Sequence, residues 1–214
     1  EENLGRQIKG SYGRKAFWLM VEMTVWGEHE NLWLHRYNLE GDPDDEVVQA
    51  VDRLEEQPWE PEAWRRDLTD RNAFSVDDAS TLDIDDALSC RRLPSGGWEV
   101  GIHIADPSSH VEPGSPLDEH ARARGTSIYL PWKTIPMFPK RLSEEKASLV
   151  ADSQRPALSI LATFNEALEM QDHEVVPAVV QVDQRLTYRE ADALIAGETD
   201  EEPAEALRKL RQLA

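Results

Sequence analysis

The sequence predicts an α+β fold: a mostly antiparallel sheet with surrounding helices, preceded by a small N-terminal appendage. Three observations support this expectation. Alternating apolar segments separated by turn-rich joints dominate from Phe74 onward, which is typical of strands. Helical periodicity and capping signals flank those segments on both sides. The 214 residues suffice for one good hydrophobic core, or for one domain with a smaller appendage.

The N-terminal forty residues show weaker patterns than the rest of the chain. An amphipathic-looking stretch comes first, and "MTVWGEHENLWLHRYNL" (23–39) combines apolar residues with a turn around Gly27. This pattern suggests a short hairpin within a small, helix-rich appendage.

One amphipathic helix is predicted in "GDPDDEVVQAVDRLEEQP" (41–58). Its apolar face consists of Val47, Val48, Val51 and Leu54. Pro58 and Pro61 break the pattern, so we place a domain boundary near residue 60. Residues 1–60 then form a small N-terminal segment whose fold the sequence leaves open, and residues 61–214 form the main domain.

A β-hairpin is predicted soon after Phe74. The segments "ALSCRRL" (87–93) and "WEVGIHIA" (98–105) flank the turn-rich loop "PSGG". Along the second strand, an apolar face alternates with a face formed by Glu99, Gly101 and His103. The apolar face consists of Trp98, Val100, Ile102 and Ile104.

The next part of the chain begins with a helix. Ser115, Pro116 and Gly125 mark its N-cap, its first position and its C-terminal stop. Three strands are then predicted in chain order, namely "TSIYLP" (126–131), "ALSILATF" (157–164) and "VVPAVVQV" (175–182). Pro177 in the third strand favours an edge or a bulge.

Two helices are predicted at the end of the chain. Thr187 and Glu190 form a capping box that opens the helix "YREADALI" (188–195). The last helix lies in "EEPAEALRKLRQLA" (201–214), and one face of it carries Leu207, Leu210 and Leu213. That face needs a partner, and no later segment of the sequence supplies one.

The charge balance is strongly acidic, with 42 Asp and Glu against 23 Lys and Arg and a formal net charge of −19. Taken alone, this argues against binding to a phosphate backbone, because that affinity usually comes from Lys and Arg. The single Cys90 excludes a disulfide within the chain and fits a reducing compartment. No apolar run reaches membrane-spanning length, and no signal-peptide pattern opens the chain. We therefore expect a soluble, intracellular, cytoplasmic protein without a membrane partner.

The stretch "FSVDDASTLDIDDAL" (74–88) places carboxylates where the chain also builds its core. Its candidate site residues are Asp77, Asp83, Asp85 and Asp86. Like charges at this spacing repel, and each buried carboxylate carries a desolvation cost. A divalent cation reverses both penalties, and hard oxygen ligands suit Mg²⁺, with Mn²⁺ as an alternative, better than zinc. Two such ions about 4 Å apart can clamp the attacking and leaving oxygens of a phosphodiester displacement.

Three other interpretations of this stretch compete. A calcium loop is one, although the spacing lacks the Gly and Glu of an EF-hand. The D-x-D-D pattern of terpene cyclases is another, although those proteins are large and all-helical. The third is an ordinary Asx-rich turn with solvated side chains. The motif alone does not decide among them.

The blocks that follow the carboxylates carry a family resemblance. They are "DDASTLDIDDALSC", "GIHIADPSSHVEPGSPLDEHARARGTSIYLP", "IPMFPKRLSEEKASL" and "RPALSILATF", in this order. Together they resemble the catalytic domain of the ribonuclease II family, the RNB domain, which includes RNase R and exosome-type exonucleases. The resemblance runs from about Trp64 to about Ile195.

The resemblance implies a magnesium-dependent exoribonuclease that degrades single-stranded RNA processively from its 3′ end and releases nucleoside 5′-monophosphates. The family's four catalytic, metal-binding aspartates correspond to Asp77, Asp83, Asp85 and Asp86. All four are present, which favours an active enzyme. The alternative, from another class, is a non-catalytic RNA-binding or interaction module that retains the fold.

Tyr129 corresponds to the family's substrate-binding aromatic residue near the 3′ end of the RNA. An aromatic face stacks on any base without sequence preference. Because stacking needs the ring and not the hydroxyl, we expect Tyr129→Phe to behave almost normally. The competing interpretation is a strand tyrosine packed in the core.

Other polar residues near these blocks carry weaker expectations. Magnesium does not prefer imidazole, so we interpret His103 as a sheet histidine whose hydrogen bonds are satisfied, and not as a metal ligand. For the same reason we do not expect His110 to bind a metal. Asp106 is a candidate for orienting a neighbouring side chain. A cluster of basic residues either meets phosphates or forms a solvated face; its members are Lys133, Lys140 and Arg141.

The chain also departs from the family pattern. It reads "KASLVAD" (146–152) where many members read "LCSLNPG". We therefore expect a loop near the active site to differ from the family's loop. The family's later half, which holds a basic residue that assists catalysis and a second stacking aromatic, has no counterpart. We therefore expect residues 61–214 to be the N-terminal portion of an RNB catalytic domain, in a monomeric protein whose remaining RNA-binding parts lie outside this chain.

Overall fold

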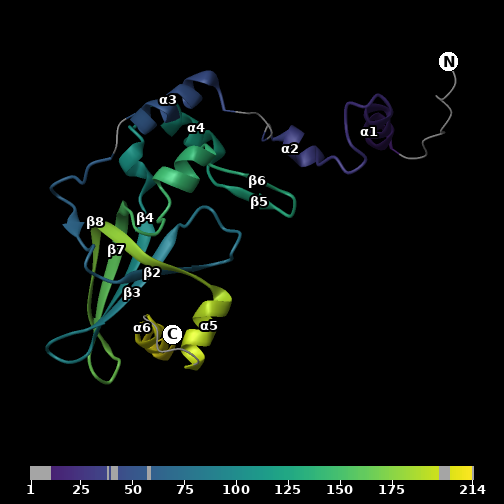
Figure 1. The fold of residues 1–214 in the computed structure, drawn as a ribbon. Coiled ribbons are helices and arrows are strands. Elements are labelled where there is room, and N and C mark those ends of the chain that lie inside the picture. The colour runs from purple at the N-terminus through teal and green to yellow at the C-terminus, as the bar shows by residue number, and fades with distance from the viewer. Residues whose placement is uncertain (1–10, 38, 40–42, 57–58, 198–202, 214) are drawn as a thin grey trace, which may run out of the picture. The chain divides into compact units, whose positions relative to one another are not determined.

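The computed structural model describes residues 11–37, 39, 43–56, 59–197 and 203–213 (Figure 1). The chain divides into two compact units, Glu1–Asp42 and Pro43–Ala214. The expected boundary near residue 60 therefore differs from the division between the units, because the helix before it belongs to the second unit. No helix in the described ranges is long and apolar enough to cross a membrane.

The first unit contains helix α1 (Tyr12–Glu22) and helix α2 (Leu32–Arg36). The hairpin predicted around Gly27 is wrong, because the described residues of this unit form no strand. The Gly27 amide donates to the Glu30 carboxylate, and the Asn31 side chain accepts from the Trp33 amide, at 3.0 and 3.1 Å. These two contacts make a turn and an N-cap, so the chain starts a helix where a second strand was expected.

In the second unit, helix α3 (Asp45–Glu56) packs on helix α4 (Pro116–Arg124). Val47 and Val51 are buried in a cluster with Leu117, whereas Val48 is 42% exposed. The predicted helix is confirmed, but its buried face is narrower than expected. Of the two prolines expected to end α3, Pro58 lies outside the described residues.

The main sheet has six strands in the order β1-β8-β2-β3-β4-β7. Their bounds are β1 (Arg66–Asp67), β2 (Ala73–Asp77), β3 (Asp86–Arg92), β4 (Trp98–Ala105), β7 (Gln154–Phe164) and β8 (Met170–Thr187). Strand β8 runs parallel to β1 and β2, and the other pairs are antiparallel. Because β8 also pairs with β7, the hydrogen-bonded order from β8 through β2, β3, β4 and β7 returns to β8. The mostly antiparallel sheet with surrounding helices is confirmed.

Strands β3 and β4 form the predicted hairpin. Gly96 and Gly97 have φ of +84° and +80°, a conformation that favours glycine. A Cβ on Gly97 would lie 2.1 Å from the Phe164 carbonyl oxygen, so the turn also needs a residue without a side chain there. Local turn chemistry therefore explains why sequence patterns located this hairpin.

The two faces of β4 differ from ordinary expectation. Ile102 and Ile104 on the apolar face are 38% and 40% exposed, whereas His103 on the opposite face is fully buried. The His103 ring bonds Ser89 Oγ through Nε2 at 2.9 Å and Ser159 Oγ through Nδ1 at 2.8 Å. The interpretation of His103 as a satisfied sheet histidine is confirmed, and burial lowers its pKa to about 4.

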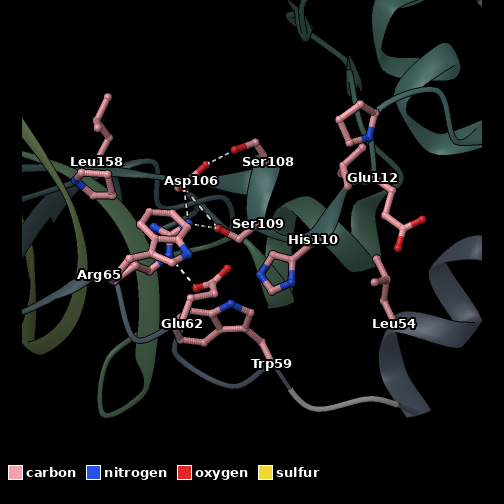
Figure 2. A pocket seen from close by; sticks show the side chains of 14 residues that line it. Leu54, Trp59, Glu62, Arg65, Asp106, Ser108, Ser109, His110, Glu112 and Leu158 are labelled. Carbon is pink, nitrogen blue, oxygen red and sulfur yellow. Dashed lines mark hydrogen bonds and ion pairs between the residues drawn. The ribbon is translucent and has the colours of Figure 1, made fainter.

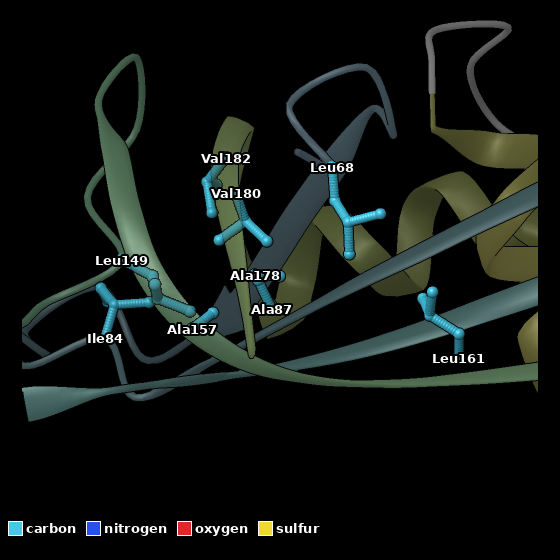
Figure 3. Close-up of a cluster of buried hydrophobic side chains, with 9 residues drawn as sticks. All are labelled: Leu68, Ile84, Ala87, Leu149, Ala157, Leu161, Ala178, Val180 and Val182. Atoms are coloured by element: carbon cyan, nitrogen blue, oxygen red, sulfur yellow. The ribbon is translucent and has the colours of Figure 1, made fainter. Parts of the chain in front are cut away.

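One buried cluster of this unit lies against the His103 side of the sheet and at the loop that carries the candidate aspartates. Figure 3 shows its nine buried side chains. They are Leu68, Ile84, Ala87, Leu149, Ala157, Leu161, Ala178, Val180 and Val182. Ile84, from the carboxylate stretch, is only 1% exposed.

Helices α5 (Tyr188–Ala196) and α6 (Ala204–Leu213) pack together against β2 and β3 (Figure 1). Thr187 and Glu190 form the predicted capping box. The expectation that the Leu207 face lacks a partner is wrong, because Leu207 is buried in a cluster with Phe74 and Leu194. The partner precedes the helix in sequence, which the pattern of the last helix alone could not show.

The remaining elements form the second, smaller sheet and two short helices. Strands β5 (Ile128–Leu130) and β6 (Lys133–Ile135) pair as an antiparallel hairpin. A 3₁₀ helix, η1, spans Pro107–His110, and a π-helix, η2, spans Arg141–Lys146.

Candidate active site

The four candidate aspartates lie at the junction of β2 and β3. Asp77 is the last residue of β2 and Asp86 is the first residue of β3, while Asp83 and Asp85 lie in the connection. The two strands are antiparallel, with Phe74 opposite Leu88. The chain therefore leaves and re-enters the sheet at the same end, which brings carboxylates nine residues apart in sequence to one edge.

Ile84 explains how carboxylates and core residues share this stretch. Its amide donates to Ser148 Oγ, and its carbonyl accepts from the Leu149 amide, both at 2.9 Å. The Ile84 side chain is buried, whereas Asp83 is half-buried and Asp85 is exposed. One anchored apolar residue thus fixes the loop and leaves its acidic neighbours at the surface.

The first half of the connection is held by different contacts. Asp78 Oδ1 accepts from the Ser80 amide and hydroxyl at 2.9 and 2.6 Å, and these bonds lower the pKa of Asp78. Arg185 on β8 donates to the carbonyls of Asp78 and Thr81. The ordinary Asx turn therefore describes Asp78, which is not one of the four candidates.

The candidates themselves repel one another. Desolvation, and then the charges of Asp86 and Asp83, raise the pKa of Asp77, although Ser75 and the charge of Arg185 act in the opposite direction. Desolvation, and then the charges of Asp83, Asp86 and Asp77, raise the pKa of Asp85. Asp77 Oδ2 is buried and has no hydrogen-bond partner. Within the described part of the chain, no ion pair within 4 Å joins any of the four to a Lys or Arg side chain.

The donor chemistry of this cluster suits a hard divalent cation, which would satisfy the unpartnered oxygen and neutralise the repulsion. The side-chain arrangement is less complete. Across the described residues, no three His, Cys, Asp or Glu side chains are grouped so that they could hold a metal ion. The residue types therefore fit a cation, while the side chains do not converge on one point.

Tyr129 joins this cluster from the β5–β6 hairpin. Its hydroxyl donates to Asp83 Oδ2 at 2.7 Å. Tyr129 as a whole is 63% exposed. The bond to Asp83, followed by desolvation, raises the pKa of Tyr129 to about 12. The structure thus brings the candidate RNA-binding residue to the candidate metal ligands. The hydroxyl therefore has a specific partner, which the expectation for Tyr129→Phe does not take into account, and that expectation stays a prediction.

Asp106 lies in a different acidic site, which Figure 2 shows. Asp106 Oδ2 accepts from Arg65 at 2.7 Å and from Ser109 at 3.1 Å, and Oδ1 accepts from Ser108 at 2.5 Å. Burial opposes ionisation, but the bonds from Ser108 and Arg65 outweigh it and lower the pKa of Asp106. The neighbouring side chains that Asp106 contacts are therefore Arg65, Ser108 and Ser109, and none of the four candidates is among them.

Residues of this second site line a pocket of about 680 Å³, and none of the four candidate aspartates lines it. Arg65, with a side chain only 2% exposed, pairs with Glu62 at 2.7 Å as well as with Asp106. Trp64 lies against its guanidinium, 4.6 Å from carbon to ring centroid. His110 also lines the pocket, and burial lowers its pKa. These contacts tie the segment before β1 to the end of β4.

Two of the three basic residues near the active-site blocks have acidic partners of their own. Lys140 pairs with Glu144 at 3.3 Å, and Arg141 pairs with Asp52 at 2.5 Å. Lys133 is exposed on β6. The solvated-face interpretation therefore fits Lys140 and Arg141 better than contact with phosphates.

Sequence reasoning missed two residues that shape the cluster, Ser148 and Arg185. Ser148 lies in the "KASLVAD" segment, whose sequence indicates a departure from the family pattern but no role for this serine. Arg185 lies more than one hundred residues from the carbonyls that it binds. No local pattern could have indicated it.

Comparisons with known proteins match most of the chain. The model of the RNB domain matches residues 65–214. An uncharacterized ribonuclease of Synechocystis sp. is 36% identical over 200 residues, covering 91% of this chain and 30% of that protein. Ribonuclease R of Chlamydia trachomatis is 34% identical over 172 residues, covering 80% of this chain and 25% of that protein. The chain thus spans less than a third of the length of these relatives.

Solved structures show the same fold. RNase R of Mycoplasma genitalium, in complex with ribose-methylated single-stranded RNA, superimposes with a TM-score of 0.72 at 23% identity, covering 84% of this chain and 28% of that chain. Yeast Ssd1, a pseudonuclease, gives a TM-score of 0.62 at 25% identity, covering 73% and 20%. On the extent of the family match, supported by these relatives, this chain belongs to the RNB domain family of ribonucleases.

Proposed function

We propose that this chain carries the catalytic carboxylates of a magnesium-dependent exoribonuclease. The enzyme would hydrolyse single-stranded RNA from its 3′ end and release nucleoside 5′-monophosphates, acting as a monomer together with further RNA-binding parts. Mn²⁺ is the alternative cation. The substrate class has support from the relatives named ribonuclease and from the RNase R structure with bound RNA.

One observation carries the proposal: four carboxylates gather at the β2–β3 edge without a compensating ion pair in the described ranges, and two of them have raised pKa values. A purely structural site would neutralise such charges, because uncompensated carboxylates reduce stability. Perturbed groups of this kind concentrate at functional sites. A chain that keeps all four gains from them only when a cation is present.

Different residues of the chain would bind the cation, stack on the RNA and hold the loop. Asp77, Asp83, Asp85 and Asp86 would hold the cation, and Tyr129 would grip the last base with its ring. Bound magnesium supplies activation of water and neutralisation of the charge that develops on the phosphate. Ser148 and Arg185 keep the loop that carries Asp83 and Asp85 in place.

The test uses full-length protein and single-stranded RNA labelled at either end. We expect 5′-labelled RNA to shorten stepwise from its 3′ end with Mg²⁺ and to stay intact with a chelator. Asp86→Asn should abolish hydrolysis while RNA binding persists, because binding draws on stacking and backbone contacts.

Asp78→Asn is the matched control for this test. Asp78 lies on the same loop but is occupied by its own turn, and Asn preserves that acceptor. Its rate should stay within about twofold of the wild type. A folded Asp86→Asn protein that hydrolyses RNA as fast as the wild type would overturn the assignment.

A second candidate function is RNA binding without hydrolysis. It is favoured by the absence of a converged metal-binding group among the described side chains and by the likeness to the pseudonuclease Ssd1. Under this alternative, RNA stays intact with Mg²⁺, and Asp86→Asn binds it as tightly as the wild type. The labelled-RNA assay of the wild type therefore separates the two functions, and a binding titration checks that RNA is bound under either one.

A further inference from the structure

We propose that the hydroxyl of Tyr129 is a positioning group for Asp83 and sets the affinity of the carboxylate cluster for a divalent cation. This inference rests on the proposed function and adds a role to a residue that is otherwise expected to act only through its ring. The observation behind it is the 2.7 Å bond from the Tyr129 hydroxyl to Asp83 Oδ2.

The β5–β6 hairpin holds the backbone of Tyr129 in place. Tyr129 lies opposite Thr134 in the β5–β6 pair, and Ile135 in the same hairpin is only 4% exposed. Ser127, two residues before Tyr129, accepts from the Met137 amide at 2.9 Å. The hairpin therefore presents the hydroxyl from a backbone that is fixed independently of the aspartate loop.

The bond has a defined effect on Asp83. A carboxylate offers two oxygens with about four acceptor positions, so a donor on Oδ2 leaves Oδ1 free for a cation. The same donor fixes the rotation of the carboxylate and spreads its charge in a cluster of like charges. The donor comes from a hairpin outside the loop that carries Asp83, so the bond ties the carboxylate to a separate element.

The bond also links two tasks of the site. The ring of Tyr129 is the face expected to stack on the last base, and its hydroxyl holds a candidate metal ligand. A base stacked on the ring would restrict the ring and, through the hydroxyl, Asp83. Occupation by the RNA end and occupation by the cation are then coupled, and the coupling acts in both directions.

A competing account makes an opposite prediction. If the hydroxyl merely fills the place that a cation takes, the cation must displace it, and its removal strengthens cation binding. If the hydroxyl positions Asp83, its removal weakens cation binding. The sign of the change in Tyr129→Phe therefore decides between the two accounts.

The experiment measures Mn²⁺ binding to full-length protein without RNA, from the electron paramagnetic resonance signal of free Mn²⁺. We expect Tyr129→Phe to bind Mn²⁺ about tenfold more weakly than the wild type, the lower end of the effect of removing such a partner. Trp132→Ala is the matched control, because Trp132 is a 67% exposed aromatic residue of the same hairpin. Its Mn²⁺ affinity should equal that of the wild type.

A double-mutant cycle shows whether the effect acts through Asp83. In an Asp83→Asn background, Tyr129→Phe should change Mn²⁺ affinity by less than about twofold, since the coupled charge is gone. A short RNA oligonucleotide in chelator should bind Tyr129→Phe and the wild type equally, because the ring remains. A general structural defect would instead weaken both ligands in both backgrounds.

Two outcomes overturn the inference alone: Mn²⁺ affinity in Tyr129→Phe that is unchanged or tighter, or an equal loss in the Asp83→Asn background. In both cases the wild type still binds Mn²⁺ and hydrolyses RNA. A wild-type protein that neither binds Mn²⁺ nor shortens RNA overturns the proposed function itself, and this inference with it.

Discussion

Two acidic sites flank the β3–β4 hairpin, and they handle their charges in opposite ways. At the β2–β3 edge, Asp77 and Asp85 have raised pKa values, and desolvation is the first cause of both. In the pocket of Figure 2, Asp106 is also desolvated, yet Arg65 and Ser108 lower its pKa. Density of aspartates therefore does not identify the functional site. What distinguishes the candidate active site is that no ion pair within 4 Å joins its carboxylates to a Lys or Arg among the described residues, although the charge of Arg185 partly opposes the raised pKa of Asp77. A folded protein can tolerate such a cost where a bound ligand offsets it.

The largest expected effect comes from breaking the compensated site. Arg65→Ala leaves Glu62 and Asp106 without their buried partner, so the free energy of unfolding should fall by about 3–5 kcal/mol. Urea denaturation of both proteins measures the change. Arg66→Ala is the control, because Arg66 is an exposed neighbour whose pair with Glu174 lies at the surface. An equal loss in both variants would show that Arg65 has no special role.

The pH dependence of stability extends the comparison to His103, a buried group whose hydrogen bonds are made by its neutral form. The pKa of His103 is about 4 in the folded protein against 6.5 in a model peptide, so the unfolded chain binds the proton first. Stability is full above pH 6.5 and is lost as the pH falls toward 4, by up to about 3 kcal/mol. Urea denaturation across this range tests it.

His103→Asn is the variant to compare with the wild type in that titration. It should be less stable at pH 7 but should lose much less on acidification, since the titrating group is gone. Identical slopes for the two proteins between pH 6.5 and 4 would contradict the assignment of this dependence to His103.

The smallest effect is expected at the uncompensated edge, and its sign is reversed. The raised pKa of Asp77 means that its ionised form costs stability, a cost that is complete once the pH exceeds that pKa. Because solvent screens this partly buried charge, Asp77→Asn should raise the free energy of unfolding at pH 7 by no more than about 1 kcal/mol in the absence of metal. Excess Mg²⁺ should remove this advantage, because it stabilises the wild type alone. A less stable Asp77→Asn protein without metal would contradict the picture of an uncompensated edge.

The parts of the fold that sequence predicted are those set by neighbouring residues. The turn at Gly96 and Gly97, the N-cap at Ser115 and the capping box at Thr187 each rest on contacts within a few residues. The hairpin predicted for residues 23–39 was wrong because Asn31 caps a helix in a stretch whose apolar residues are typical of a strand. Local chemistry decided both the successes and this error.

What sequence could not predict depends on distant contacts. Tyr129 and Asp83 are 46 residues apart, so the bond between them follows from the placement of two separate hairpins. The exposure of Ile102 and Ile104, and the burial of His103, follow from which side of β4 receives the core. The four aspartates were found from their pattern and family resemblance, whereas Ser148 and Arg185, which hold their loop, were not.

The closed order of the sheet has a consequence for the order of events during synthesis on the ribosome. Arg185 lies on the last strand, and it binds carbonyls 107 and 104 residues earlier, at Asp78 and Thr81. The aspartate loop therefore emerges well before the strand that completes its support, and contacts of such long range form slowly. An emerging chain would carry all four aspartates without their final geometry until β8 leaves the exit tunnel and closes the ring.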